Sequence, residues 1–142
     1  MKMAVLTTSA TATGGREGRV ESEDYVLQFD TAMPGTPRAK ELEDATNPEQ
    51  LFAAGYASCF DGALNLIAGK EKVKLDSETT ASVSLLNDET DKGFKLAVKL
   101  TVKAAGVEKS VLENLVHKAH DFCPYSKATR GNIDVQLEVV TA

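Results

Sequence analysis

The strongest constraint on the fold is an apolar segment, residues 48–70, that begins with clear helix-start signals. Asn47 is a favoured N-cap residue, Pro48 suits the first helical position, and Gln50 is placed for a capping box. The larger apolar side chains recur at the spacing of one helical stripe: Phe52, Tyr56, Cys59, Phe60, Ala63, Leu64 and Ile67. The other faces carry small residues, so another element can approach closely. The pattern predicts a central, buried helix from Pro48 to about Lys70.

Alternating apolar and polar residues predict β-strands on both sides of this helix. Residues 5–13 are rich in Thr and Ala and end at the turn signal Gly14-Gly15. Residues 16–23 and 25–31 read as extended segments broken near Glu23-Asp24, and the whole region predicts an N-terminal meander. Further strands are predicted over 79–86, 94–103 and 133–139. In the segment 94–103 the lysines share one face, so this strand is expected to bury the opposite face.

A second amphipathic helix is predicted over 108–122, and Pro124 marks its end. Residues 30–45 contain Pro34, Gly35 and Pro37 with little periodicity, which predicts a long loop. Several strands with two principal helices, in no regular βαβ alternation, indicate an α+β fold. The length of 142 residues predicts a single domain over 1–142.

Composition excludes several function classes. The chain carries 16 basic and 21 acidic residues, a net charge of −5, which disfavours nucleic acid as a partner. Its apolar runs fall short of the ~18 residues that a membrane helix needs, so no membrane association is expected. The N-terminal segment turns polar at Thr7 and lacks the apolar region of a secretory signal. We therefore expect a cytoplasmic protein.

The chain has two cysteines, Cys59 and Cys123, which are either buried small residues or reactive groups. Cys59 lies about twelve residues into its helix, beyond the reach of the helix N-terminus, so a reactive thiolate there would need a cation from elsewhere. Cys123 lies at the C-terminal end of the second helix, where the helix dipole disfavours a thiolate. Cys123 is thus the poorer nucleophile and suits a resolving role, although simple packing remains an alternative for both cysteines.

Arg16 and Glu49 are the other candidate site residues. Glu49, at the second position of the long helix, suits either stabilisation of the helix end or orientation of an arginine. Ten residues at ~1.5 Å each place it about 15 Å from Cys59, so it cannot touch that cysteine of its own helix. Arg16 follows Gly14-Gly15 and is either a solvated turn residue or the permanent cation that a thiolate needs.

His117, His120 and Cys123 recur every three residues and are candidate metal ligands. Residues at this spacing drift by about 60° per step around a helix, so three ligands converge poorly. A tetrahedral zinc site would also need a fourth ligand. We therefore predict no metal, and a metal-binding or redox-inert scaffold remains the alternative of a different class.

Three motifs resemble the organic hydroperoxide resistance proteins, the Ohr branch of the Ohr/OsmC family. The amino-terminal motif is ATGGREG at residues 12–18. The catalytic-helix motif is ATNPEQLFAAGYASCF at residues 45–60, and the second-cysteine motif is AHDFCPYSKATRGNI at residues 119–133. The resemblance extends from about residue 5 to residue 140, and the stretch from Glu71 to Val107 matches in pattern only.

The resemblance implies an OsmC-like fold and a thiol peroxidase that reduces organic hydroperoxides. It implies that Cys59 is the peroxidatic cysteine, Cys123 the resolving cysteine, and Arg16 and Glu49 the catalytic arginine and glutamate. It further implies a Cys59–Cys123 disulfide, an intertwined homodimer, no cofactor, and an external dithiol reductant, typically a lipoylated protein.

Apolar residues near these positions are candidates for a substrate pocket: Phe52, Tyr56, Phe60, Phe122 and Met33. The sister OsmC branch, with the same chemistry, is the second reading of the motifs. A redox sensor that passes its oxidation to a partner is a further alternative.

Overall fold

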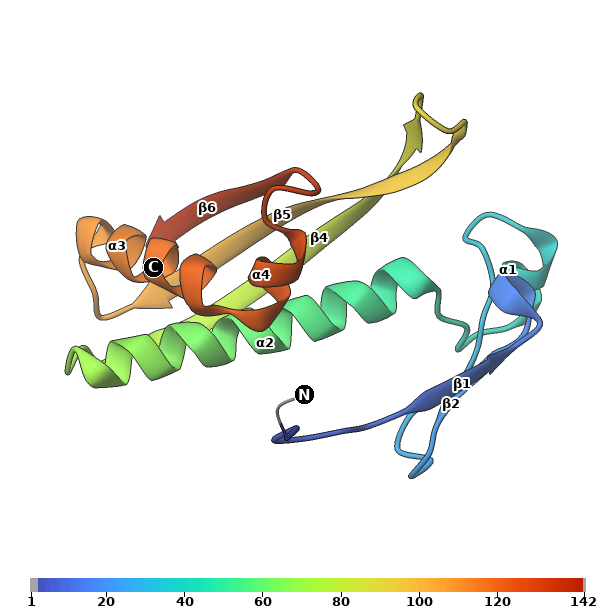
Figure 1. Ribbon diagram of the computed structural model, residues 1–142, viewed down its shortest axis with the longest axis horizontal. Helices are drawn as coiled ribbons and strands as arrows, with labels where there is room; N and C mark the ends of the chain where they lie inside the picture. The colour runs from blue at the N-terminus through green and yellow to red at the C-terminus, as the bar shows by residue number, and fades with distance from the viewer. Residues whose placement is uncertain (1–2, 142) are drawn as a thin grey trace. The chain divides into compact units, whose positions relative to one another are not determined.

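A computed structural model of the chain describes residues 3–141 (Figure 1). Met1, Lys2 and Ala142 lie outside the described residues. Met1 and Lys2 are part of the N-terminal segment for which no secretory signal is predicted. The chain divides into two compact units, Met1–Leu51 and Phe52–Ala142. A single domain over the whole chain stays a prediction, and the two units are described separately.

The first unit is built on an antiparallel sheet of β1 (Ala10–Thr13), β2 (Arg19–Ser22) and β3 (Gln28–Asp30), in that order. Thr13 pairs with Arg19 across β1 and β2, and Val20 pairs with Phe29 across β2 and β3. The predicted N-terminal meander is therefore confirmed, but the segment predicted as extended over 16–23 forms a strand only from Arg19 to Ser22, because residues 15–17 form a single 3₁₀ turn.

The strand predicted over residues 25–31 is too long at its start. Tyr25 has a positive φ of 61°, and its backbone N–H donates to the Ser22 carbonyl, so a turn precedes β3. The Asp24 carboxylate accepts hydrogen bonds from the Ser22 hydroxyl and the Val26 N–H. These local bonds satisfy the backbone in place of a strand ladder and leave Tyr25, Val26 and Leu27 exposed despite their alternation.

The segment predicted as a loop over 30–45 contains a short helix, α1 (Pro37–Glu41). The Thr36 hydroxyl accepts a hydrogen bond from the Ala39 N–H, and Pro37 occupies the first helical position. The start signals were therefore present in the sequence, but a helix of five residues is too short to show periodicity.

The long helix α2 spans Pro48–Lys70, as predicted. Asn47 caps it, since its side-chain oxygen accepts a hydrogen bond from the Gln50 N–H at 2.8 Å. The Gln50 side chain accepts a hydrogen bond from the Thr46 hydroxyl instead of reaching back to Asn47. Only one half of the predicted capping box is therefore formed.

One face of α2 is buried within the chain, where Tyr56, Phe60 and Leu64 are completely inaccessible. Other faces, including that of Leu66, are exposed, so the expectation of a helix buried on several sides is wrong for the isolated chain. By length and composition α2 also qualifies as a membrane span, contrary to the expectation from uninterrupted apolar runs. Its few charged residues lower its mean hydropathy only slightly, and the core helices of soluble proteins are often equally apolar.

The second unit contains a sheet in the order β4 (Asp76–Asp88), β5 (Gly93–Ala105), β6 (Val135–Thr141). Strands β4 and β5 are antiparallel, whereas β5 and β6 are parallel. Two helices, α3 (Lys109–Phe122) and α4 (Pro124–Thr129), connect the parallel pair. Pro124 ends α3 as predicted but also begins α4, which the sequence analysis missed.

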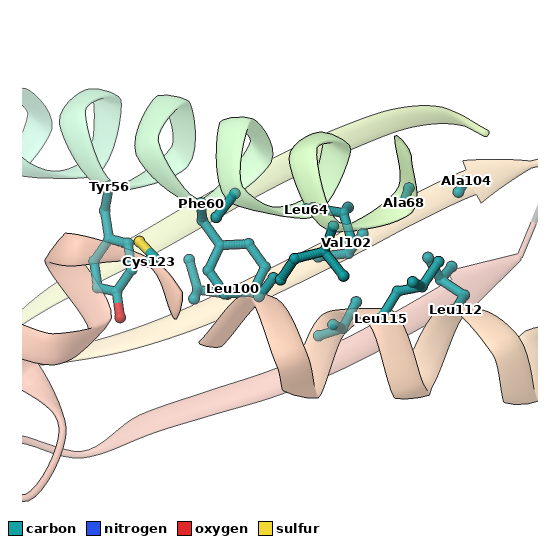
Figure 2. Close-up of a cluster of buried hydrophobic side chains, with 14 of the residues drawn as sticks. Tyr56, Phe60, Leu64, Ala68, Leu100, Val102, Ala104, Leu112, Leu115 and Cys123 are labelled. Atoms are coloured by element: carbon teal, nitrogen blue, oxygen red, sulfur yellow. The ribbon is translucent and has the colours of Figure 1, made fainter. Parts of the chain in front are cut away.

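The hydrophobic core of the second unit lies between α2, α3 and β5 (Figure 2). Leu100 and Val102 extend from β5 toward Leu112 and Leu115 of α3. The lysines of β5 lie on the opposite, exposed face, which confirms the predicted orientation of that strand from Val98 onward. Phe94, on the face predicted to be buried, is exposed at the start of the strand, beyond the helices that cover the core. The mixture of antiparallel strands, one parallel pair and packed helices confirms the α+β class.

Candidate active site

A tight turn between β1 and β2, the 3₁₀ helix η1 (Gly15–Glu17), carries Arg16 in the first unit. Gly14 and Gly15 have φ values of 72° and 60°, which favour glycine. At Gly18 a Cβ would lie 1.8 Å from the Thr13 carbonyl oxygen, so this position also needs glycine. The glycines of the amino-terminal motif therefore form the turn that presents Arg16.

Arg16 forms a two-pronged ion pair with Glu49. One guanidinium nitrogen, Nη1, donates to Oε2 at 3.1 Å, and Nη2 lies 2.9 Å from Oε1. The Glu49 side chain is only 13% exposed, whereas that of Arg16 is 43% exposed. Such paired geometry fixes the plane of a guanidinium. The structure thus brings together the two residues that were expected to act as a pair, and part of the Arg16 side chain stays accessible.

Cys59 of α2 and Cys123, at the junction of α3 and α4, are in contact in the second unit. Their sulfur atoms are 3.6 Å apart, although the residues are 64 positions apart in the sequence. Both thiols are free, Cys123 is completely buried, and Cys59 is partly exposed. A disulfide needs a sulfur separation of about 2.05 Å, so a small approach of the two side chains suffices to form one.

The surroundings of Cys59 in this unit do not favour its thiolate. Burial raises the pKa of Cys59 above its ordinary value, the Tyr125 backbone N–H lowers it, and the neighbouring Cys123 raises it further. The net direction is upward. A Cys59 thiolate at neutral pH therefore needs a cation beyond these contacts.

A buried chain of hydrogen bonds lies behind the cysteine pair. The Tyr56 hydroxyl lies 2.8 Å from the Ser126 hydroxyl and 3.0 Å from that of Thr129. Ser126 in turn lies 2.8 Å from Nδ1 of His120. Figure 2 shows Tyr56 beside Cys123, and these bonds join α2 to α4 and to the end of α3. Sequence reasoning missed Ser126 and Thr129, whose i, i+3 spacing on the short helix α4 was the available signal.

Tyr125 is a second residue that the sequence analysis missed. Its ring centroid lies 5.7 Å from that of Tyr56 and 6.2 Å from that of Phe52. A Cβ at Gly55 would lie 2.7 Å from the Tyr125 hydroxyl, so glycine lets this ring reach α2 one turn before Cys59. The small residue at position 55 thus creates an aromatic cluster beside the peroxidatic candidate.

The candidate pocket residues do not gather at one place. Phe52 and Tyr56 pack edge to face, but Tyr56 and Phe60 are completely buried and offer no surface to a ligand in this chain. The ring of Phe122 is exposed and lies under the ammonium groups of Lys70 and Lys127. Met33, which is 40% exposed, belongs to the first unit.

Among residues 3–141, no three histidine, cysteine or acidic side chains are grouped so that they could hold a metal ion. The His120 ring instead bonds to Ser126, as described above.

The fold agrees with comparisons to known proteins. The family model for OsmC-like proteins matches residues 39–138. Solved structures reproduce the whole fold: the crystal structure of the organic hydroperoxide resistance protein OhrB of Bacillus subtilis has a TM-score of 0.91 at 50% identity. That match covers 96% of this chain and 100% of the other.

Relatives in sequence define the branch. The organic hydroperoxide resistance protein OhrA of Bacillus subtilis strain 168 is 65% identical over 139 residues, which cover 98% of this chain and 99% of that protein. The organic hydroperoxide resistance protein of Xanthomonas axonopodis pv. citri is 50% identical, with 92% of each chain covered. The chain therefore belongs to the organic hydroperoxide resistance proteins of the OsmC-like family.

Proposed function

We propose that this protein reduces organic hydroperoxides to alcohols, with Cys59 as the peroxidatic and Cys123 as the resolving cysteine. The observation that carries the proposal is the 3.6 Å contact between the two free thiols. The names of its relatives, organic hydroperoxide resistance proteins, supply the class of substrate.

Arg16 is assigned as the cation that stabilises the Cys59 thiolate. The pKa of Cys59 is raised by burial, and an arginine is charged at any physiological pH. Glu49 holds the guanidinium through two contacts and acts as its positioning residue. The arginine comes either from the same chain or from a second copy in a homodimer.

The reaction then follows in three steps. The Cys59 thiolate attacks the oxygen of the hydroperoxide that is farther from the organic group, the O–O bond breaks, and the alkoxide takes up a proton to leave as an alcohol. Cys59 becomes a sulfenic acid. The Cys123 thiol attacks this sulfur, which forms the disulfide and releases water.

A dithiol reductant restores the enzyme by thiol–disulfide exchange, in which the Cys59–Cys123 disulfide is reduced and the dithiol becomes a disulfide. We propose a lipoylated protein in this role, with no metal or organic cofactor. Such a cycle suits the cytoplasm, where thiols are kept reduced.

Exposed aromatic and apolar side chains would favour organic substrates over hydrogen peroxide. Phe52 lies two helical turns before Cys59, the half-exposed ring of Tyr125 packs near Phe52, and Phe122 adjoins Cys123. Contact with apolar groups gains free energy for a bulky hydroperoxide that hydrogen peroxide cannot gain.

The proposal is tested by counting free thiols in the reduced protein before and after stoichiometric tert-butyl hydroperoxide, with hydrogen peroxide in parallel. We expect fast loss of both thiols with the organic peroxide, slower loss with hydrogen peroxide, and recovery on addition of dihydrolipoamide. Survival of both thiols would mean that Cys59 and Cys123 are packing residues.

Two variants separate the roles of the cysteines. Cys59→Ser should abolish peroxide turnover. Cys123→Ser should permit one oxidation, after which Cys59 is oxidised further to the sulfinic acid, a gain of two oxygen atoms visible by intact mass. Sustained turnover by Cys123→Ser with a dithiol reductant would contradict the resolving role.

A further inference from the structure

We propose that Thr31 is a positioning residue for Arg16, with Arg38 as its support: the Thr31 hydroxyl holds the η1 turn in the conformation that directs the guanidinium to Glu49. This inference rests on the proposed role of Arg16 in activating Cys59. All the residues involved belong to the first unit, so the argument needs no contact with the second.

The Thr31 hydroxyl closes the turn from both ends. It donates a hydrogen bond to the Gly15 carbonyl at 2.9 Å and accepts one from the Gly18 N–H at 2.9 Å. These two groups bracket Arg16 and Glu17. Thr31 is only 4% exposed, so water is excluded from competing for the same bonds.

Arg38 of α1 supports the same turn through two backbone carbonyl groups. Its Nε donates to the Thr31 carbonyl at 2.9 Å, and its Nη2 donates to the Gly18 carbonyl at 3.0 Å. The Gly18 carbonyl also accepts from the Thr31 N–H at 2.9 Å. Hydrogen bonds to its backbone therefore fix the position of Thr31, and the Thr31 hydroxyl in turn fixes the η1 turn.

The turn needs this support because little else in its sequence restricts it. It consists of three residues, and a single 3₁₀ turn has poor hydrogen-bond geometry of its own. Gly14 and Gly15 add conformational freedom rather than stiffness. A two-pronged contact between Arg16 and Glu49 tolerates only small errors in position. Loss of the Thr31 hydroxyl should therefore let the Arg16 guanidinium adopt several orientations instead of the one that binds Glu49.

A merely structural role for Thr31 would lower stability without changing the chemistry of Cys59. The test therefore uses the pH dependence of Cys59 alkylation, which reports its pKa, and the second-order rate of thiol loss with tert-butyl hydroperoxide. Thr31→Val removes the hydroxyl at nearly constant volume, and Thr31→Ser restores it. The matched control is Ser22→Ala, because Ser22 is another buried hydroxyl that closes a turn in the same sheet.

We expect Thr31→Val to raise the Cys59 pKa and to slow oxidation by about 10- to 100-fold, the range found when residues that orient a metal ligand are replaced. Thr31→Ser should recover most of the rate, and Ser22→Ala should leave both readouts unchanged. In an Arg16→Ala background, Thr31→Val should have no further effect on either readout, because its effect acts through Arg16.

The outcomes separate this inference from the proposed function. If Arg16→Ala raises the Cys59 pKa while a folded Thr31→Val matches the wild type, the positioning role is wrong and the role of Arg16 stands. If Arg16→Ala itself changes neither readout, the proposed activation of Cys59 is wrong, and the positioning role is overturned with it. If Thr31→Val does not fold, Arg38→Met replaces it, and an unchanged Cys59 pKa in that variant overturns the inference.

Discussion

The Tyr56 hydroxyl joins α2 to α4, and Ser126 extends the same network to α3. It contacts the hydroxyls of Ser126 and Thr129, and Ser126 continues to His120. Tyr56, Ser126 and Thr129 are buried, so each lost hydrogen bond leaves a polar atom that water cannot reach. At the scale of the residue, this network determines where the segment that follows Cys123 sits against α2.

The first prediction concerns this hydroxyl. Tyr56→Phe should lower the free energy of unfolding by about 1–3 kcal/mol, because it leaves buried hydroxyls with fewer partners. Urea denaturation measures the change. Tyr125→Phe is the matched control, since it removes a hydroxyl from a half-exposed ring, where a change within about 0.5 kcal/mol is expected. Equal losses in the two variants would contradict the importance of the buried network.

A second residue-scale prediction concerns pH. Burial lowers the pKa of His120 below its ordinary value of 6.5, Arg130 lowers it further, Asp121 raises it, and His117 lowers it. The unfolded chain then binds the proton at a higher pH than the folded chain does. Stability should be fully present above pH 6.5 and should fall as the pH drops through 6.5 toward the folded pKa.

The measurement is urea denaturation of the wild type and of His120→Gln at pH 7.5 and at pH 5.5. Glutamine keeps a hydrogen-bonding group for Ser126 but does not titrate. The variant should lose less stability on acidification than the wild type. Equal losses would show that other groups carry the pH dependence.

At the scale of the element, the start of α2 combines two functions in neighbouring residues. Asn47 caps the helix, and Glu49 binds Arg16. A carboxylate at the second helical position also interacts favourably with the helix dipole, so a stability effect alone would not identify its role. The two functions can be separated by their readouts.

We predict that Asn47→Ala lowers the free energy of unfolding by about 1 kcal/mol, the typical cost of a lost N-cap, and changes the Cys59 pKa little. Glu49→Ala should raise the Cys59 pKa and slow oxidation less than Arg16→Ala does, because Glu49 acts through the guanidinium. Urea denaturation and pH-dependent alkylation measure the two effects. If Glu49→Ala lowers only stability, Glu49 serves the helix and not the site.

At the scale of the whole molecule, α2 has the composition of a core helix but is buried on one face only within the chain. Leu66 and the small residues of its other faces remain exposed. We interpret this uncovered face of α2 as an interaction surface. These features support the proposed homodimer, in which a second copy covers α2.

We therefore predict that the protein sediments with twice the mass of one chain at micromolar concentration. Leu66→Glu should shift the equilibrium toward the monomer, because it places a charge on the uncovered face of α2. Val111→Glu is the control, since Val111 is exposed on α3 to a similar degree. A monomeric wild type at these concentrations would contradict the dimer.

Local patterns determined the larger elements of this protein. The bounds of α2 and the alternation of β5 follow from helix caps, Pro48, and repeated apolar spacing, all of which act between residues that are close in sequence. The roles expected for Cys59, Cys123, Arg16 and Glu49 came from motif resemblance, and they remain proposals.

Tertiary structure alone decided the contacts between distant segments. The 3.6 Å approach of Cys59 to Cys123, the parallel pairing of β5 with β6, and the hydroxyl of Thr31 closing the Arg16 turn join residues far apart in the chain. The turn at Tyr25 and the short helix α1 were missed because side-chain hydrogen bonds and caps outweigh periodicity in segments this short. The helix α4, with six residues, is too short to show periodicity. Sequence periodicity reports which face of an element is buried, whereas packing decides which residues meet there.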